Sequence, residues 1–168
     1  MNARAEHLSK TLKRRFPLST LLANYTLPAI QADTAIRKKD YQVAIDILQR
    51  CVPYDLASHE DFPEGITIYL RGVAYLGIGS VKEASAQFEN LLNHRGLIAL
   101  SPYWPLAHLG LARAAAKAHD TDRSLAEYRE VLSFWKNADP DVPVLSQAQK
   151  EYRKLDESAS SRSRIVSR

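Results

Sequence analysis

The sequence predicts an all-α protein, a solenoid of antiparallel helix pairs. The 168-residue chain repeats with a period of 40 residues, apolar side chains recur at steps of three and four within each period, and short polar turns occupy the same place in each. Helix pairs stacked in this way bury their apolar faces against their neighbours. We expect about three and a half pairs and a C-terminal capping helix, all in a single domain over residues 1–157.

A shift of 40 residues aligns apolar side chains in two columns. The first column holds Leu8, Leu48, Phe88 and Tyr128, and the second, four positions later, holds Leu12, Val52, Leu92 and Leu132. The polar turns of the three periods are Lys39-Asp40, Gly79-Ser80 and His119-Asp120. This register predicts full repeats at 20–52, 63–93 and 102–136, each made of a first helix, a turn and a second helix.

Residues 3–16 are the first expected element. Leu8 and Leu12 share the register of the second helices of the later repeats, so we expect half a repeat whose first helix is missing. The chain would then begin within a solenoid and expose an apolar stripe of Ala5, Leu8 and Leu12. This stripe would pack on upstream sequence, on a second copy of the chain, or on nothing.

The three full repeats carry helical spacing and helix-start signals. Ala84, Phe88 and Leu91 follow one another at steps of three and four, which places them on one helix face. Four prolines stand at or just before expected helix starts, where a missing N–H costs little; they are Pro63, Pro102, Pro105 and Pro143. Pro28 lies inside a first segment, so we expect a kink there or a helix that begins near Thr26.

Two long loops and a cap complete the predicted architecture. Residues 53–63 and 94–105 separate the repeats, and we expect the apolar second loop to fold back over the gap between repeats two and three; its apolar members are Leu97, Ile98, Leu100, Tyr103 and Trp104. Residues 143–156 form an amphipathic capping helix with the stripe Val144, Leu145, Ala148, Tyr152 and Leu155. The tail 158–168 has too little apolar content to pack, so we expect it to be disordered.

One stretch of the middle repeat resembles a known family. The pattern Gly72-x-x-Tyr75-x-x-x-Gly79-x-x-x-x-Ala84-x-x-x-Phe88 is similar to the tetratricopeptide repeat signature. The resemblance implies a right-handed superhelix in which small residues let paired helices approach and the aromatic fills the gap between successive pairs. The usual repeat has about 34 residues, and here the surplus falls in the two loops between repeats.

A more specific family resemblance covers residues 3–155. The stretches YLRGVAYLGIG, FENLLNHRGLIALSP, AHLGLARAAAKAHD and FWKNADPDVPVLSQAQKEYRKL resemble the C-terminal repeat region of large bacterial regulators. In those proteins a eukaryotic-like serine/threonine kinase domain or a winged-helix DNA-binding domain precedes the repeats. The resemblance implies the sensory or partner-binding arm of a signalling protein. The sequence has neither a kinase glycine-rich loop nor an HRD-type catalytic loop.

Charge and composition argue against several function classes. The net charge of +4 is concentrated at the ends, with five Lys/Arg and one Glu in residues 1–15 and three Arg in 158–168. A nucleic-acid binder clusters its cations on one face of the fold, so we expect no nucleic-acid partner. No apolar run approaches the roughly 20 residues of a membrane helix, and one cysteine excludes internal disulfides. We expect a soluble cytoplasmic protein without a membrane partner.

Candidate chemistry favours a non-catalytic protein. The histidines form neither an H-x-x-x-H nor an H-E-x-x-H pair, and no cysteine lies near them, so we expect no metal site. Cys51, beside Val52, is expected to be a buried small hydrophobe. The acid pairs Glu60-Asp61 and Asp139-x-Asp141 lie in loops and are expected to be solvated turn residues. The six glycines form no nucleotide-binding motif, so we expect no cofactor and no enzyme activity.

The remaining candidate site is the concave groove. In tetratricopeptide superhelices the first helix of each pair lines the inner surface, and the resemblance implies groove residues Asp33, Ile36, Arg37, Ile66, Tyr69, Val73, Leu109, Arg113 and Lys117. The basic residues beside Tyr69 would clamp an acidic or carboxylate-bearing peptide, or they are ordinary solvated charges. The leading hypothesis is therefore a protein- or peptide-binding scaffold, and the alternative is a self-assembly module that dimerises through the N-terminal end.

Overall fold

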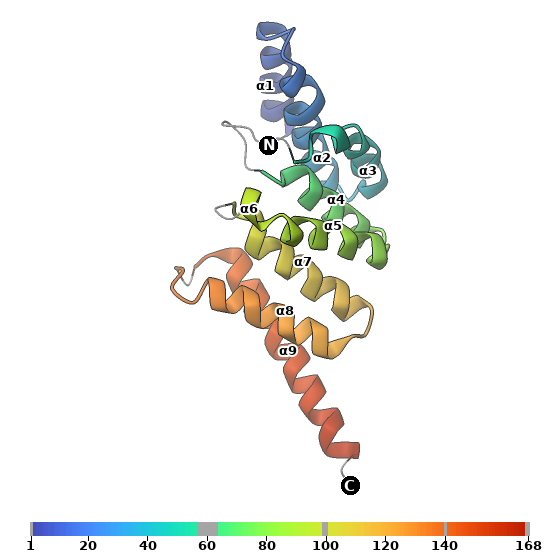
Figure 1. Ribbon diagram of the computed structural model, residues 1–168, viewed down its shortest axis with the longest axis vertical. Coiled ribbons are helices and arrows are strands. Elements are labelled where there is room, and N and C mark those ends of the chain that lie inside the picture. Colours follow the sequence, from blue (N-terminus) through green and yellow to red (C-terminus); the bar gives the residue numbers. More distant parts are fainter. Residues whose placement is uncertain (1, 57–63, 99–100, 140, 167–168) are drawn as a thin grey trace.

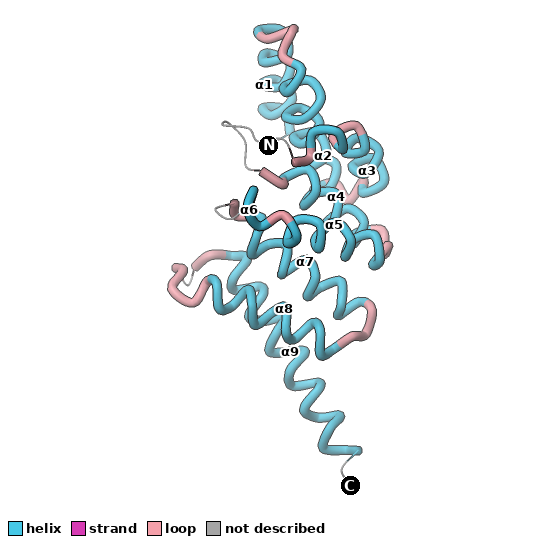
Figure 2. Tube along the Cα trace, viewed as in Figure 1, coloured by secondary structure: helices cyan, strands magenta, loops and turns pink. Residues whose placement is uncertain are grey.

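The chain folds into helices that follow one another along a single axis. The computed structural model describes residues 2–56, 64–98, 101–139 and 141–166, and these ranges contain helices, turns and loops but no strand (Figure 1 and Figure 2). The elements are α1 (Asn2–Arg15), η1 (Leu22–Thr26), α2 (Leu27–Arg37), α3 (Tyr41–Gln49), η2 (Val52–Tyr54), α4 (Ile66–Gly77), α5 (Val81–Asn93), α6 (Arg95–Ile98), α7 (Tyr103–Lys117), α8 (Thr121–Phe134) and α9 (Pro143–Val166).

The helices form two layers. Within each predicted repeat the two helices pack together, as α2 with α3, α4 with α5, and α7 with α8. The second helix of each pair also packs on the next first helix, so that α3 contacts α4, α5 contacts α7, and α8 contacts α9. The first helices α2, α4 and α7 contact each other in that order and form one layer, whose outer surface we call the inner face because the prediction places the groove there. The predicted all-α solenoid of tetratricopeptide-like helix pairs is confirmed.

The three intra-repeat turns share one backbone conformation. Lys39, Gly79 and His119 each have a positive φ, between 61° and 83°, directly after the first helix of their pair. The next residue donates its N–H back into that helix, as Asp120 does to the Ala115 carbonyl at 2.9 Å, which is the Schellman arrangement of a helix end. The register predicted from the 40-residue shift is therefore present in the backbone geometry.

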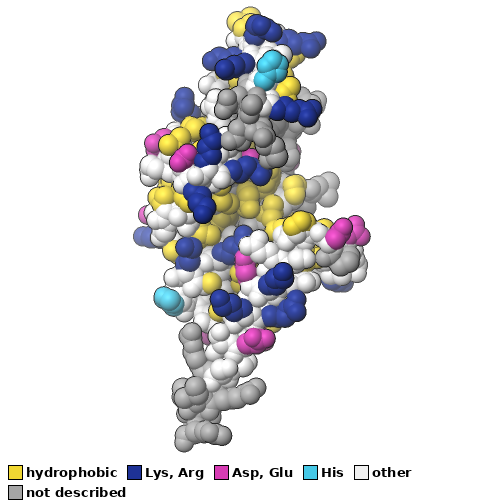
Figure 3. Space-filling view, turned by 180° about the vertical axis from the view of Figure 1, so that it is seen from behind, with side chains coloured by type: hydrophobic (Ala, Val, Ile, Leu, Met, Phe, Trp, Pro, Cys, Tyr) yellow, Lys and Arg dark blue, Asp and Glu magenta, His cyan; other side chains and the backbone are white. Residues whose placement is uncertain are grey.

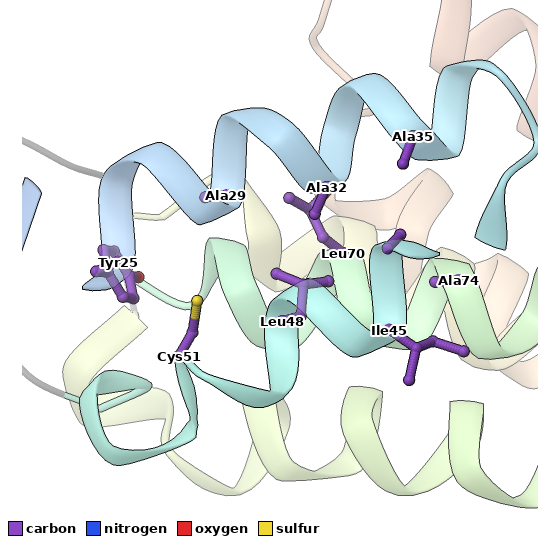
Figure 4. Packing of buried hydrophobic residues seen from close by; sticks show 10 residues of the cluster. Tyr25, Ala29, Ala32, Ala35, Ile45, Leu48, Cys51, Leu70 and Ala74 are labelled. Atoms are coloured by element: carbon purple, nitrogen blue, oxygen red, sulfur yellow. The ribbon is translucent and has the colours of Figure 1, made fainter. Parts of the chain in front are cut away.

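The core consists of three clusters that follow the repeats. The first lies between α2, α3 and α4 and includes Tyr25, Leu48 and Leu70 (Figure 4). In the second, Phe88 is wholly buried, and a Cβ added at either Gly72 or Gly110 would lie 2.6 or 2.5 Å from its ring. Gly72 of the signature and Gly110 on the next first helix thus let these two helices close on the aromatic ring of the helix between them. The third cluster joins α7 and α8 to α9.

The irregularity expected at Pro28 is a π-helical turn. Residues Leu22–Thr26 form η1, and the N–H of Leu27 donates to the carbonyl of Leu22, five residues earlier. Pro28 has no N–H, and its ring would clash with the carbonyl four residues before it in a regular helix. A wider turn upstream removes that conflict, and the chain then continues directly into α2.

The predictions for the C-terminal tail, the 94–105 loop and the N-terminal stripe differ from the structure or fall partly outside the described residues. Residues 158–166, expected to be disordered, continue α9, because no proline or glycine interrupts them and the Ser158 and Ser161 hydroxyls donate to carbonyls one turn earlier. Within the expected 94–105 loop, Arg95–Ile98 forms the short helix α6, and Tyr103 and Trp104 begin α7 and pack on the second cluster. Leu100 and the side chains of Leu97 and Ile98 lie outside the described residues, as does the side chain of Ala5.

The N-terminal helix is attached differently from the others. α1 packs on α2, while Leu8, in the expected stripe, keeps 52% of its surface exposed. Figure 1 shows α1 and the turn that follows it at one end of the elongated molecule. None of the described helices combines the length and apolar composition that spanning a bilayer requires.

Candidate protein-binding face

The inner face is formed by the first helices α2, α4 and α7, which lie side by side. Its apolar side chains are partly buried rather than enclosed, and they include Ile36, Ile66, Tyr69, Val73 and Tyr103. Viewed from behind, the molecule shows hydrophobic side chains gathered at mid-height with Lys and Arg side chains around them (Figure 3). An apolar surface with a charged surround is the usual composition of a protein-binding patch.

Two tyrosines are the main aromatic contact of the inner face. The ring centroids of Tyr69 on α4 and Tyr103 on α7 lie 5.1 Å apart, and Tyr69 also contacts Phe88 at 6.1 Å. Burial raises the pKa of Tyr103 to about 12, with smaller contributions from Tyr69, Tyr25 and Asp33. Burial also raises the pKa of Tyr69, although Arg113 opposes the shift. Both hydroxyls therefore stay protonated at neutral pH and remain hydrogen-bond donors.

Neither of these two hydroxyls bonds to another described residue. Within the described part of the chain, the Tyr69 and Tyr103 side chains make ring contacts and pack on the core clusters, but their hydroxyls form no hydrogen bond. Tyrosine combines a large rigid apolar surface with a polar tip at low cost in conformational entropy. The pair is thus able to pack against an apolar side chain and to bond a peptide backbone at the same time.

The predicted cationic clamp is largely neutralised. On α2, the Arg37 guanidinium donates to Asp33 at 2.7 Å, one helical turn away, and this bond is the main cause of the raised pKa of Arg37. On α7, Arg113 donates to both carboxylate oxygens of Glu151, at 2.9 and 3.2 Å. Lys117 is exposed and pairs with no carboxylate within the described ranges. Two of the three expected cations therefore already have a counter-ion.

Leu109 does not line the inner face. It is only 1% exposed and belongs to the third core cluster with Ala112, Tyr128 and Ala148. The physical reason is the position of α7, which is covered by α5 on one side and by α8 on the other. A helix packed between two neighbours buries a larger part of its circumference than a surface helix does, and Leu109 lies in the buried part.

Sequence reasoning missed a buried ionic network at the first repeat junction. Arg71 on α4 is 3% exposed and pairs with Asp55, and it also donates to the Leu48 carbonyl at 2.9 Å and to Gln87 at 2.8 Å. The Thr67 hydroxyl donates a hydrogen bond to the Asp55 carboxylate at 2.7 Å. A charged residue within the otherwise apolar run IYLRGVAYL was the one signal of this network in the sequence.

The described side chains show little that would support catalysis. Among them, no three His, Cys, Asp or Glu residues come close enough to hold a metal ion. Cys51 is fully buried, and burial raises the pKa of its thiol to about 11, so the reactive thiolate is scarce at neutral pH. The His108 imidazole lies 2.7 Å from Glu127, beside the rings of Trp104 and Phe134. This pair links α7 to α8 in a packed aromatic cluster.

Comparison with known proteins supports the repeat architecture. No family model matches the chain, and no solved structure matches it. The chain is similar to the tetratricopeptide repeat and J domain-containing co-chaperone DNJ1 of Fusarium oxysporum f. sp. lycopersici, with 36% identity over 77 residues, which cover 46% of this chain and 14% of that protein. The likeness thus concerns about one seventh of the co-chaperone. It supports a tetratricopeptide-like helical protein and, in general terms, a scaffold for protein interaction.

Proposed function

We propose that the chain is a non-catalytic scaffold that binds a peptide segment of a partner protein across the inner face of α2, α4 and α7. The Tyr69–Tyr103 pair carries this proposal, because two tilted rings in contact, whose hydroxyls bond to no described residue, lie on the layer that successive first helices form. Rigid aromatic side chains at the centre of an apolar patch are typical anchors of protein interfaces. The similarity to a tetratricopeptide co-chaperone supports the same class of function.

The preferred peptide follows from the charges of this face. Asp33 and Glu151 neutralise Arg37 and Arg113, so a single terminal carboxylate gains little from either cation. We propose that affinity comes mainly from apolar or aromatic side chains packed on the tyrosines and from hydrogen bonds to the peptide backbone. Lys117 adds a contact for an acidic residue at one end. The resemblance to repeat regions of bacterial regulators supports a role as the interaction arm of a cytoplasmic signalling or transcription regulator.

Peptide selection from a random library, followed by NMR mapping, tests this proposal. Selected peptides should shift amide resonances of α2, α4 and α7 more than those of α3, α5 and α8. Tyr69→Phe and Tyr103→Phe keep the rings but remove both hydroxyls, so the double variant should bind several-fold more weakly. Val43→Ser, on the exposed side of α3, is the matched control and should bind as the parent does. Selected peptides that map to the outer helices would overturn the proposal.

Self-assembly through the N-terminal end is the second candidate function. The observation that favours it is the half-exposed Leu8 on α1, in register with second helices that are covered in the later repeats. Sedimentation velocity over a range of protein concentrations tests it. A dimer that dissociates on the substitution Leu8→Ser supports self-assembly, whereas a monomer at every concentration refutes it.

A further inference from the structure

The end of the molecule formed by α1 and the turn into η1 exposes several large apolar side chains. Leu18 is 94% exposed, Phe16 is 50% exposed and Leu21 is 42% exposed. One exposed leucine on a surface needs no explanation, but several at one end form a patch. We call residues 13–21 the N-terminal tip; it lies at one extreme of the long axis (Figure 1).

The tip is also strongly cationic. Lys13, Arg14 and Arg15 form the last turn of α1 and are all exposed, and the Arg15 guanidinium lies 5.7 Å from the centre of the Phe16 ring. The sequence from residue 7 to residue 32 contains no Asp or Glu, so no acidic side chain from that stretch offsets these charges. Figure 3 shows apolar side chains at this extremity with Lys and Arg side chains beside them.

The combination of protruding apolar side chains and flanking cations fits the surface of an anionic lipid bilayer. The negative potential of such a surface attracts Lys and Arg side chains, and apolar side chains next to them enter the boundary between headgroups and acyl chains. We propose that the N-terminal tip binds an anionic membrane surface, with Phe16 and Leu18 inserted and Lys13, Arg14 and Arg15 on the lipid phosphates. Binding of this kind is peripheral and needs no spanning helix.

Charge and shape distinguish this occupant from the others. Two copies that pair through the same patch would place identical cationic turns against each other, and like charges across an interface oppose association. A protein partner would need a pocket to receive the protruding side chains, whereas a fluid lipid surface adapts to them. The inner face is formed by α2, α4 and α7, which follow one another away from the tip (Figure 1), so it stays accessible when the tip is on a membrane.

Vesicle flotation with the full chain tests the proposal. The protein should float with vesicles of phosphatidylcholine containing phosphatidylserine, and much less with phosphatidylcholine alone or at high salt. Phe16→Ser with Leu18→Ser should lower vesicle partitioning roughly tenfold or more, because two large apolar side chains no longer leave water. Arg14→Gln with Arg15→Gln should lower it as well and reduce its dependence on salt. All four positions are exposed, so these variants should fold, which circular dichroism checks.

Matched controls keep the outcomes distinct. Val43→Ser removes a comparably exposed apolar side chain from α3, and Lys150→Gln with Lys154→Gln removes two exposed cations from α9; both should float as the parent does. Leu18→Trp should add a fluorescence component that shifts to shorter wavelength on the anionic vesicles. Failure to float, or flotation that the apolar substitutions leave unchanged, would overturn the proposal. Reversible dimers abolished by Phe16→Ser with Leu18→Ser, without vesicle binding, would assign the tip to a second copy.

Discussion

The first and the last junctions of the solenoid each contain an arginine–carboxylate pair, but the two pairs differ in burial. At the first junction Arg71 and Asp55 are almost fully enclosed and hydrogen-bonded on every side. At the last junction the side chains of Arg113 and Glu151 are 30% and 28% exposed. When one partner of a buried pair is removed, the other charge stays buried without a counter-ion or water, which strongly destabilises the fold. When one partner of a partly exposed pair is removed, water solvates the remaining charge and the loss of stability is small. The first junction should therefore be much the more sensitive to substitution.

The largest expected effect is that of Arg71→Leu. The substitution leaves the Asp55 carboxylate buried without its counter-ion, and breaking such a pair costs about 3–5 kcal/mol. Urea denaturation monitored by circular dichroism measures this loss in the free energy of unfolding. The double variant Arg71→Leu with Asp55→Leu removes both charges and should lose much less than the two single variants together. Strict additivity of the two losses would contradict the argument.

The middle junction is held by apolar packing instead of a buried ion pair. A substitution there should lower the free energy of unfolding less than Arg71→Leu does. Gly110→Ala places a methyl group 2.5 Å from the buried Phe88 ring, and overpacking of this kind costs about 1–3 kcal/mol. The expected result is a lower melting temperature with helix content retained. Gly96→Ala, whose new methyl group would meet nothing within 4 Å, is the control and should not lower stability.

A smaller effect is expected for Glu151→Gln at the last junction. Glu151 accepts bonds from Arg113, from the Tyr128 hydroxyl at 2.8 Å, and from Gln147 at 2.8 Å. The amide keeps part of this network but loses the charge, so we expect a loss of about 1 kcal/mol. Hydrogen exchange should become faster in α9 and remain unchanged in α2 and α3. Faster exchange along the whole chain would show that the last junction is not a local element.

The same carboxylate should make the last junction sensitive to acid. Burial by itself would raise the pKa of Glu151, but its hydrogen bonds from Arg113 and Tyr128 lower it below the ordinary value of 4.5. A depressed folded-state pKa means that this stabilisation is complete above pH 4.5 and is lost as the pH falls through the folded-state value. The protection of α9 against exchange, taken relative to the intrinsic exchange rate at each pH, should therefore fall below pH 4.5, and Glu151→Gln should reduce that dependence. An unchanged profile in the variant would remove Glu151 as the cause.

The smallest effect is expected for Arg123→Gln. Arg123 on α8 pairs with Glu89 on α5, and the two side chains are 44% and 46% exposed. Exposed pairs contribute about 0.2–1 kcal/mol, so thermal unfolding should shift by no more than a few degrees. A loss as large as that of Arg71→Leu would show that exposure is not what separates the junctions.

Some features of the candidate site could be predicted from the sequence, and others could not. Spacing identified Tyr69 on a first helix, and the packing of Phe88 between Gly72 and a later helix follows from the repeat signature. Tyr103 was counted among the apolar residues of the 94–105 loop although a helix start was predicted at Pro102, and the sequence did not show that Tyr103 would lie beside Tyr69. Leu109 was assigned to the groove, because periodicity gives the faces of one helix but not how many neighbours cover them.

The sequence by itself determined the all-α architecture, the register of the repeats and the turns at Lys39, Gly79 and His119, because these depend on local spacing and on contacts that recur every 40 residues. Arg37 and Asp33 pair within one helix, but tertiary structure alone decided which charges pair across the junctions. Arg71 meets a carboxylate 16 residues away and Arg113 meets one 38 residues away, and neither distance follows the repeat period. Local sequence thus determined the helical path of each segment, whereas the ion pairs at the junctions formed only when separate repeats packed together.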